Sequence, residues 1–430
     1  MTKIAMVFIF ALVLFDQSSR WVWSAADNDV ALDPRRVMVK TVNDLSPPAV
    51  QVDRSGNIYL AWFEKGTEED AAVLWLLRTD GSGHVVEKPI RVNRLEDPPD
   101  AIHQSPGMAL GPEGEIYLSW NVSKHSKGVG AGTDLRLARS EDGGKSFLSP
   151  VTVNDDPLPV SHGFESLTAG SDGVVYAAWL DGRDKEKGDA SGSGVFFARS
   201  MDGGKTFGKN LKVDGMACPC CRTAMAAAPD GGLLVSWRKV FEGDVRDMVV
   251  ARSMDRGKTF LSPSLVHKDG WVFPACPHRP PSIGFDREGR LYETWYTEGT
   301  DEQPRVLFAV SDDDGKTFSS PISLHTHTTS LPDHPQMAVH PDGTVLTVWE
   351  EITGVRQRVV MRASKDRWAS FAPVQTLSEG PKATNPAVSI NDAGMMAISW
   401  NERIFPNNLI ILQTGILQGV EPEERGRWKE

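Results

Sequence analysis

Histidine and cysteine residues stand at one position of a tryptophan-marked repeat in this chain of 430 residues. The residue seventeen positions before the tryptophan is His103, His162, Cys220 or His278 in four successive units, and His334 lies two positions further on in a shorter unit. The other cysteines lie beside two of these positions: Cys218, Cys221 and Cys276. Because imidazole and thiolate are ligands that zinc and copper prefer, the sequence predicts a metal site for copper or zinc, with redox activity as one use of it.

The same residues have a structural interpretation. Four cysteines are an even set, and two disulfides would tie Cys276 to one member of the cluster formed by Cys218, Cys220 and Cys221. The histidines would then hydrogen-bond to backbone between neighbouring strands. The residue types alone leave the metal and disulfide interpretations open.

The elements that must position these residues belong to a repeat that spans most of the chain. One tryptophan ends a strand in each unit, at intervals of 51 to 59 residues: Trp62, Trp120, Trp179, Trp237, Trp295, Trp349 and Trp400. Short alternating strands and glycine turns lie within each unit, and a fixed period of this kind is typical of radial β-arrays. The sequence predicts an all-β, seven-bladed β-propeller over residues 36–420, with a six-bladed propeller as the alternative.

The two ends of the repeat complement each other. Residues 36–43 match the outermost strand of later units, whereas the last unit, residues 386–417, lacks that strand. We therefore expect the N-terminal strand to complete the last blade and close the ring, which removes exposed strand edges.

A second motif, Ser-x-Asp-x-Gly-x-Thr/Ser-Phe, marks a tight hairpin. Its aspartate accepts backbone N–H bonds, its glycine takes a positive φ, and its aromatic ring packs on the neighbouring hairpin. Four complete copies occupy residues 140–147, 200–207, 253–260 and 311–318, and Trp368 replaces the glycine in a fifth, residues 364–371. These motifs resemble the Asp-box, or BNR, repeats of the sialidase superfamily, which implies a sialidase-like propeller whose boxes lie away from the catalytic face.

The resemblance implies a glycoside hydrolase site with a tyrosine–glutamate nucleophile pair, an acid/base and carboxylate-binding arginines. Four of the five tyrosines lie three positions before a repeat tryptophan and are expected in the core, whereas Tyr296 is not. Tyr296 and Glu298 fit the nucleophile pair, and Asp181 fits the acid/base. The arginines expected on the same face are Arg183, Arg222, Arg279 and Arg403.

Carboxylates recur two residues after the tryptophan, as Glu64, Asp181, Glu351 and Glu402. Charged residues are usual at exposed turns, so for this set we expect solvated loop charges.

The composition and the N-terminus limit location and partners. A net charge of −11 gives no basic surface for nucleic acid. Lys3, the apolar run 4–15 and the small residues before Ala26 fit a signal peptide over residues 1–26, too short to span a bilayer. We expect a periplasmic or secreted monomer without a membrane span in its mature form, with a leader at 27–35 and a charged tail at 421–430.

Three functions remain open from the sequence. The His/Cys set favours an exported sialidase-like propeller that binds a metal or small ligand and has redox activity as an option. The resemblance supports an exo-acting glycoside hydrolase of the exo-α-sialidase type. A non-catalytic propeller that binds glycan or protein on the same face is the third.

Overall fold

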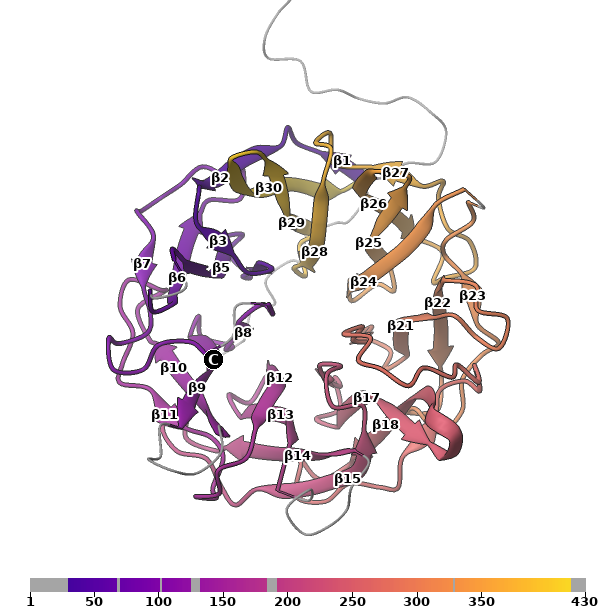
Figure 1. The fold of residues 1–430 in the computed structure, drawn as a ribbon, viewed down its shortest axis with the longest axis horizontal. Helices are drawn as coiled ribbons and strands as arrows, with labels where there is room; N and C mark the ends of the chain where they lie inside the picture. The colour runs from indigo at the N-terminus through magenta and orange to yellow at the C-terminus, as the bar shows by residue number, and fades with distance from the viewer. Residues whose placement is uncertain are drawn as a thin grey trace, which may run out of the picture.

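The computed structural model describes residues 30–67, 70–100, 103–124, 132–183, 192–327 and 329–418. These residues form an all-β propeller, whose sheets are arranged around a centre with β8, β12, β24 and β28 innermost (Figure 1). The predicted signal peptide and charged tail lie outside the described residues. No helix in the described part of the chain could cross a membrane.

The described strands form six antiparallel sheets. The first sheet comprises β3 (Asp44–Leu45), β4 (Ala49–Val52), β5 (Ile58–Lys65), β6 (Val73–Thr79) and β7 (Ile90–Arg91). The second comprises β8 (Gly107–Leu110), β9 (Ile116–Lys124), β10 (Gly132–Ser140) and β11 (Val151–Thr152). An eight-stranded sheet follows: β12 (His162–Ala169), β13 (Val175–Asp181), β14 (Ser193–Ser200), β15 (Leu211–Ala217), β16 (Ala224–Ala227), β17 (Leu233–Phe241), β18 (Val245–Ser253) and β19 (Ser264–Leu265). A short 3-10 helix, η2 (Glu242–Asp244), links β17 to β18.

The remaining sheets complete the circle. Two are four-stranded: β20 (Ser282–Phe285), β21 (Leu291–Thr297), β22 (Arg305–Ser311) and β23 (Ile322–Ser323), then β24 (Leu331–Val339), β25 (Val345–Thr353), β26 (Arg356–Ser364) and β27 (Gln375–Thr376). The last contains β28 (Ala383–Ile390), β29 (Met395–Ile404) and β30 (Asn407–Leu417) together with the N-terminal strands β1 (Val30–Leu32) and β2 (Arg36–Thr41).

The N-terminal strand closes the ring as the sequence predicts. β2 pairs with β30 from Arg36 opposite Leu412 to Thr41 opposite Asn408. The short strand β1, which lies within the expected leader, pairs with the end of the same strand. Residues far apart in the chain thereby join one sheet.

The repeat tryptophans form the core between the sheets. All seven have at most 2% of their surface exposed. Apolar clusters combine side chains of neighbouring sheets, as where Tyr59 and Leu76 pack with Ile116 and Leu118, and the largest lies within the eight-stranded sheet. Large aromatic side chains in these positions fix how adjacent sheets stack.

The box hairpins have the predicted internal bonding. In the first copy, Asp142 accepts hydrogen bonds from the backbone N–H of Lys145 and Ser146, and Gly144 has a φ of +86°. Hydrogen bonds, led by that from the Ser146 hydroxyl, lower the pKa of Asp142 to about 2. Trp368 takes a φ of +70° in the fifth copy, so the hairpin persists there without glycine.

Candidate functional site

In three sheets the start of the innermost strand lies against the last residues of the next strand. His162 faces Asp181, Pro332 faces Glu351, and Ala383 faces Glu402. A β-bulge follows in each, and its first residue has a left-handed backbone: Phe164, His334 and Asn385, with φ of +57°, +45° and +55°. His334 therefore corresponds to Phe164 and not, as its proximity in sequence suggested, to His162.

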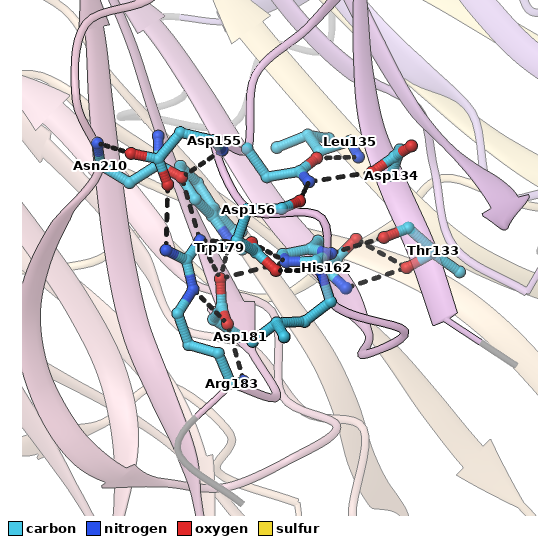
Figure 2. Close-up of polar contacts among 12 residues, drawn as sticks. Thr133, Asp134, Leu135, Asp155, Asp156, His162, Trp179, Asp181, Arg183 and Asn210 are labelled. Atoms are coloured by element: carbon cyan, nitrogen blue, oxygen red, sulfur yellow. Dashed lines mark hydrogen bonds and ion pairs between the residues drawn. The ribbon is translucent and has the colours of Figure 1, made fainter. Parts of the chain in front are cut away.

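His162 lies in a closed polar network (Figure 2). Its Nε2 is 2.7 Å from Asp156 Oδ2 and 3.5 Å from Asp181 Oδ2, and its Nδ1 is 2.5 Å from the Thr133 carbonyl oxygen. The imidazole is fully buried. Asp156, His162 and Asp181 have ligand atoms within 4.8 Å of one another but form a group separate from the cysteines. The structure thus does not bring His162 to the cysteines.

Asp181 and Arg183 face each other inside the same network. Asp181 is fully buried and accepts hydrogen bonds from Trp179 Nε1 at 2.8 Å and from Arg183 Nε and Nη2, both at 2.9 Å. Arg183 also donates to Asp155 at 3.0 Å. Burial alone would lower the pKa of Arg183, but the bonds to Asp181 and Asp155 raise it. The polar atoms of these two residues thus bind each other and their neighbours, which stabilises the sheet.

Three of the four recurrent carboxylates after the tryptophans have the same structural use. Glu351 and Glu402, like Asp181, accept a hydrogen bond from the indole N–H of their own repeat tryptophan, at 3.3 and 3.1 Å, whereas Glu64 accepts hydrogen bonds from Thr41 and Asn43. The expectation of solvated loop charges is therefore wrong for the first three residues, because each carboxylate is the acceptor of a buried indole N–H.

The cysteines do not form the predicted disulfides. Cys218, Cys220 and Cys221 are free and buried, with Sγ–Sγ distances from Cys218 of 3.7 and 3.3 Å, while Cys276 is free and exposed. Arg246 Nη1 donates to the Cys218 sulfur at 2.9 Å. Hydrogen bonds with the thiols of Cys220 and Cys221 lower the pKa of Cys218, and the contacts of Cys220 with Cys218 and Cys221 raise the pKa of Cys220.

Two exposed histidines flank this thiol cluster. The rings of His103 and His278 are 6.0 Å apart, and Phe164 lies 6.2 and 6.0 Å from them. Phe164 also packs on Cys218, Cys220 and Cys221. Burial and the positive charges nearby lower the pKa of His103. The histidines thus contact the thiol cluster through Phe164, and the group of mutually close ligand atoms among the described residues contains the three cysteines alone.

Arg222 spans two sheets beside these histidines. Its guanidinium donates to Ser105 Oγ at 2.7 Å and to the Ser105 carbonyl oxygen at 2.6 Å, and it lies 3.6 Å from the Glu165 carboxylate. Its side chain is 20% exposed. Arg222 therefore holds β12 and the segment before β8 together at the rim.

Tyr296 and Glu298 form the pair that the resemblance implied. Tyr296 Oη donates to Glu298 Oε1 at 2.6 Å, and the Arg279 guanidinium lies 4.5 Å from the centre of the Tyr296 ring. Tyr296 is 3% exposed, whereas Glu298 and Arg279 are partly exposed. Burial and the adjacent Glu298 carboxylate raise the pKa of Tyr296, so the phenol stays protonated at neutral pH.

A chain of polar contacts leads from Arg279 to a small cleft. Arg279 Nη2 donates to Asp333 at 2.7 Å, His334 Nδ1 lies 3.1 Å from Glu350, and Glu350 accepts the Asn385 N–H at 2.6 Å. Burial opposes charge on His334, but its contacts with Glu350 raise its pKa. The cleft has a volume of about 140 Å³ and includes Lys382, Asn385, Asn401, Glu402 and Arg403 in its lining. Arg403 thus lies at this cleft, away from the other predicted arginines.

Several residues of these networks were missed in the sequence. Asp156, Arg246, Asp333 and Glu350 carry their central contacts. Asp333 and Glu350 adjoin residues that were singled out, so neighbouring acids were a usable signal. Arg246 stands in the third strand of its unit, where nothing in the sequence relates it to the cysteines.

Similarity to known proteins is confined to the fold. No protein-family model and no curated protein matches the chain. The Hadza microbial sialidase Hz136 is 16% identical, with 86% of this chain and 75% of that chain covered and a TM-score of 0.50. The polysaccharide lyase Uly1 is 12% identical, with 87% and 90% of the two chains covered and a TM-score of 0.54. A fungal alcohol oxidase of the AA5 family in complex with copper is 12% identical, with 91% and 77% of the two chains covered and a TM-score of 0.57. The structural relatives therefore include a sialidase and other propeller enzymes.

Proposed function

We propose that this propeller acts on glycans that carry a carboxylate, as an exo-acting glycoside hydrolase of the sialidase type. The observation that carries the proposal is the 2.6 Å hydrogen bond from Tyr296 to Glu298, with Arg279 over the phenol ring. A hydroxyl held by an adjacent base is the usual arrangement of an activated nucleophile. A neutral phenol also avoids the repulsion that a carboxylate nucleophile would meet from an acidic sugar.

The proton flow follows from this pair. Tyr296 Oη would attack the anomeric carbon while its proton passes to Glu298, and the departing oxygen would take a proton from the exposed imidazole of His278. We assign the donor to His278 because Asp181, the acid expected from the sequence, is held by Trp179 and Arg183, and because the lowered pKa of His103 favours its neutral form. Histidine can supply or accept a proton near neutral pH.

A cationic side chain beside the tyrosine supports an acidic substrate. The Arg279 guanidinium is 24% exposed and lies 4.5 Å from the centre of the Tyr296 ring. The cleft at Lys382 and Arg403 is a separate feature, because Tyr296, Glu298 and Arg279 are not in its lining and Asp44 and Glu402 are.

The test compares two tyrosines of one strand. Tyr296→Phe removes the bond to Glu298, and Tyr292→Phe removes an equivalent 2.9 Å bond to Asp286 at the other end of β21. On aryl glycosides of sialic acid, uronic acids and arabinose, we expect Tyr296→Phe and Glu298→Gln to lower kcat at least about 100-fold and Tyr292→Phe to leave it within about threefold. A wild type inactive on the whole panel, or full activity in Tyr296→Phe, overturns the proposal.

We also infer that the propeller has seven blades. The eight-stranded sheet contains two groups of four strands, β12–β15 and β16–β19, and the connection between β15 and β17 is the single residue pair Ala217 and Lys239. Division at that pair gives seven groups, each with one repeat tryptophan.

Export through cleavage after Ala26 likewise remains our proposal, and N-terminal sequencing of the secreted protein would test it.

A further inference from the structure

Three thiols meet in the turn between β15 and β16. Cys218 Sγ lies 3.7 Å from Cys220 Sγ and 3.3 Å from Cys221 Sγ, and all three side chains are at most 5% exposed. Sulfurs that share one ion at about 2.3 Å are about 3.8–4.0 Å apart. The distance from Cys218 to Cys220 is within about 0.3 Å of this range, and the distance from Cys218 to Cys221 needs to lengthen by about 0.5–0.7 Å for the thiols to surround an ion.

The backbone holds this turn at both ends. Cys218 N donates to the Arg238 carbonyl oxygen of β17 at 2.8 Å, and Thr223 N donates to the Phe164 carbonyl oxygen of β12 at 3.1 Å. Within the turn, Cys221 N approaches the Cys218 carbonyl oxygen at 3.4 Å. Because two different sheet segments fix the turn, the three sulfurs are positioned before any ligand arrives.

The surroundings favour thiolate over thiol ligands. Arg246 is 6% exposed and donates to Cys218 Sγ at 2.9 Å, which places a positive charge against the cluster. Phe164 and Val240 pack on the thiols and limit contact with solvent. Three thiolates, one guanidinium and a monovalent ion leave a net charge of −1, which a buried site tolerates better than −3.

We propose that Cys218, Cys220 and Cys221 bind copper(I) as a three-thiolate site, independent of the glycan site. Soft thiolate ligands select copper(I), which accepts three-coordination. Structural zinc requires a fourth ligand, and within the described residues the group of mutually close ligand atoms contains only these three sulfurs. The rings of His103 and His278, once expected in this site, contact the ring of Phe164, which itself packs on the thiols.

The experiment is anaerobic titration of the full reduced chain with copper(I) against a chromogenic chelator, followed by elemental analysis. We expect one copper per chain, protection of three thiols from alkylation and continued reaction of Cys276, which is exposed. Cys220→Ser should weaken copper binding at least about 100-fold, because loss of a ligand should cost more than the roughly 10–100-fold that loss of an outer-shell partner costs. Cys276→Ser is the matched control and should bind copper as the wild type does.

Several outcomes would overturn the site. These are copper binding that persists when all three cysteines are serine, binding that depends on Cys276, and tighter binding of zinc than of copper(I). A Cys218–Cys221 disulfide that returns with no copper uptake after reduction would also overturn it, because the pair would then be a redox bridge. Circular dichroism of each variant separates loss of the ligand from loss of the fold, and Cys221→Ser provides a second variant if Cys220→Ser unfolds.

Discussion

Two regions of the molecule use the same repeat positions in opposite ways. In the β12–β15 region, His162 and Asp181 are fully buried, and every side-chain nitrogen and oxygen of Asp156, His162, Asp181 and Arg183 that is buried has a hydrogen-bond partner. In the β20–β23 region, His278 occupies the position of His162 but is exposed. Buried atoms there remain without a partner among the described residues, namely Glu293 Oε2 and Arg279 Nε.

The difference separates stability from function. A network whose polar groups are all paired stabilises a sheet and has no group left to bind a ligand. Unpaired buried groups and shifted pKa values reduce stability and are typical of functional sites. The pair of Tyr296 and Glu298 lies in the second kind of region, which is why we place the glycan site there.

Asp181→Asn should have the largest effect. The substitution leaves the fully buried His162 and the partly buried Arg183 beside a neutral amide, and loss of one member of a buried ion pair costs about 3 kcal/mol or more. The change is measured as the free energy of unfolding in guanidinium chloride. The structure predicts this loss because Asp181 is fully buried and accepts three hydrogen bonds at 2.8–2.9 Å from side chains.

Glu402→Gln is the matched control for Asp181. Glu402 occupies the same repeat position and accepts the Trp400 indole bond at 3.1 Å, but its nearest guanidinium, that of Arg35, is 3.9 Å away. We expect a loss of about 1 kcal/mol, the value of one hydrogen bond. Equal losses in the two variants would show that the arginine network contributes nothing beyond the indole bond.

Glu293→Gln should change how stability depends on pH. Burial raises the pKa of Glu293 from 4.5 to about 8, although Ser236 and Arg238 act against the shift. Between these values the unfolded chain loses this proton and the folded chain keeps it. The carboxyl's contribution is therefore complete below about pH 4.5 and declines as pH rises toward 8, by about 1.4 kcal/mol per pH unit.

The measurement is denaturant unfolding of both proteins at pH 6 and pH 7.5. The stability of Glu293→Gln relative to the wild type should rise by about 2 kcal/mol between these two pH values. Glu165→Gln is the control, because Glu165 also accepts a serine hydrogen bond but has Arg222 at 3.6 Å. No pH-dependent difference between Glu293→Gln and the wild type would place the Glu293 carboxyl in contact with water.

The fold was largely predictable because its signals are periodic. The spacing of the tryptophans, the box hairpins and the match of 36–43 to later outer strands led to a β-propeller closed by its N-terminal strand, and the propeller and the closure are confirmed. Each of these signals depends on residues close together within one repeat. Because the repeat recurs along the chain, the same evidence for the fold occurs several times in one sequence.

The candidate site was predictable only in part. The pairing of Tyr296 with Glu298 follows from two residues on one strand end, and the structure brings them together. The predicted grouping of the histidines with the cysteines was wrong for His162. A shared position in the repeat determines where a residue lies along its strand but does not determine the direction of its side chain. His162 turns toward Asp156 between sheets, whereas His278 adopts a φ of +54° and faces His103.

The smallest predicted effect is that of His278→Asn, and His162→Asn is its reference. His162→Asn removes an imidazole whose two nitrogens lie 2.5 and 2.7 Å from Thr133 and Asp156, so we expect a loss of about 1.5 kcal/mol in unfolding free energy. His278→Asn should cost less than about 0.5 kcal/mol, because the side chain is exposed and asparagine tolerates a left-handed backbone. If His278→Asn were the more destabilising of the two, the exposed region would be part of the structural core, and the distinction between the two regions would fail.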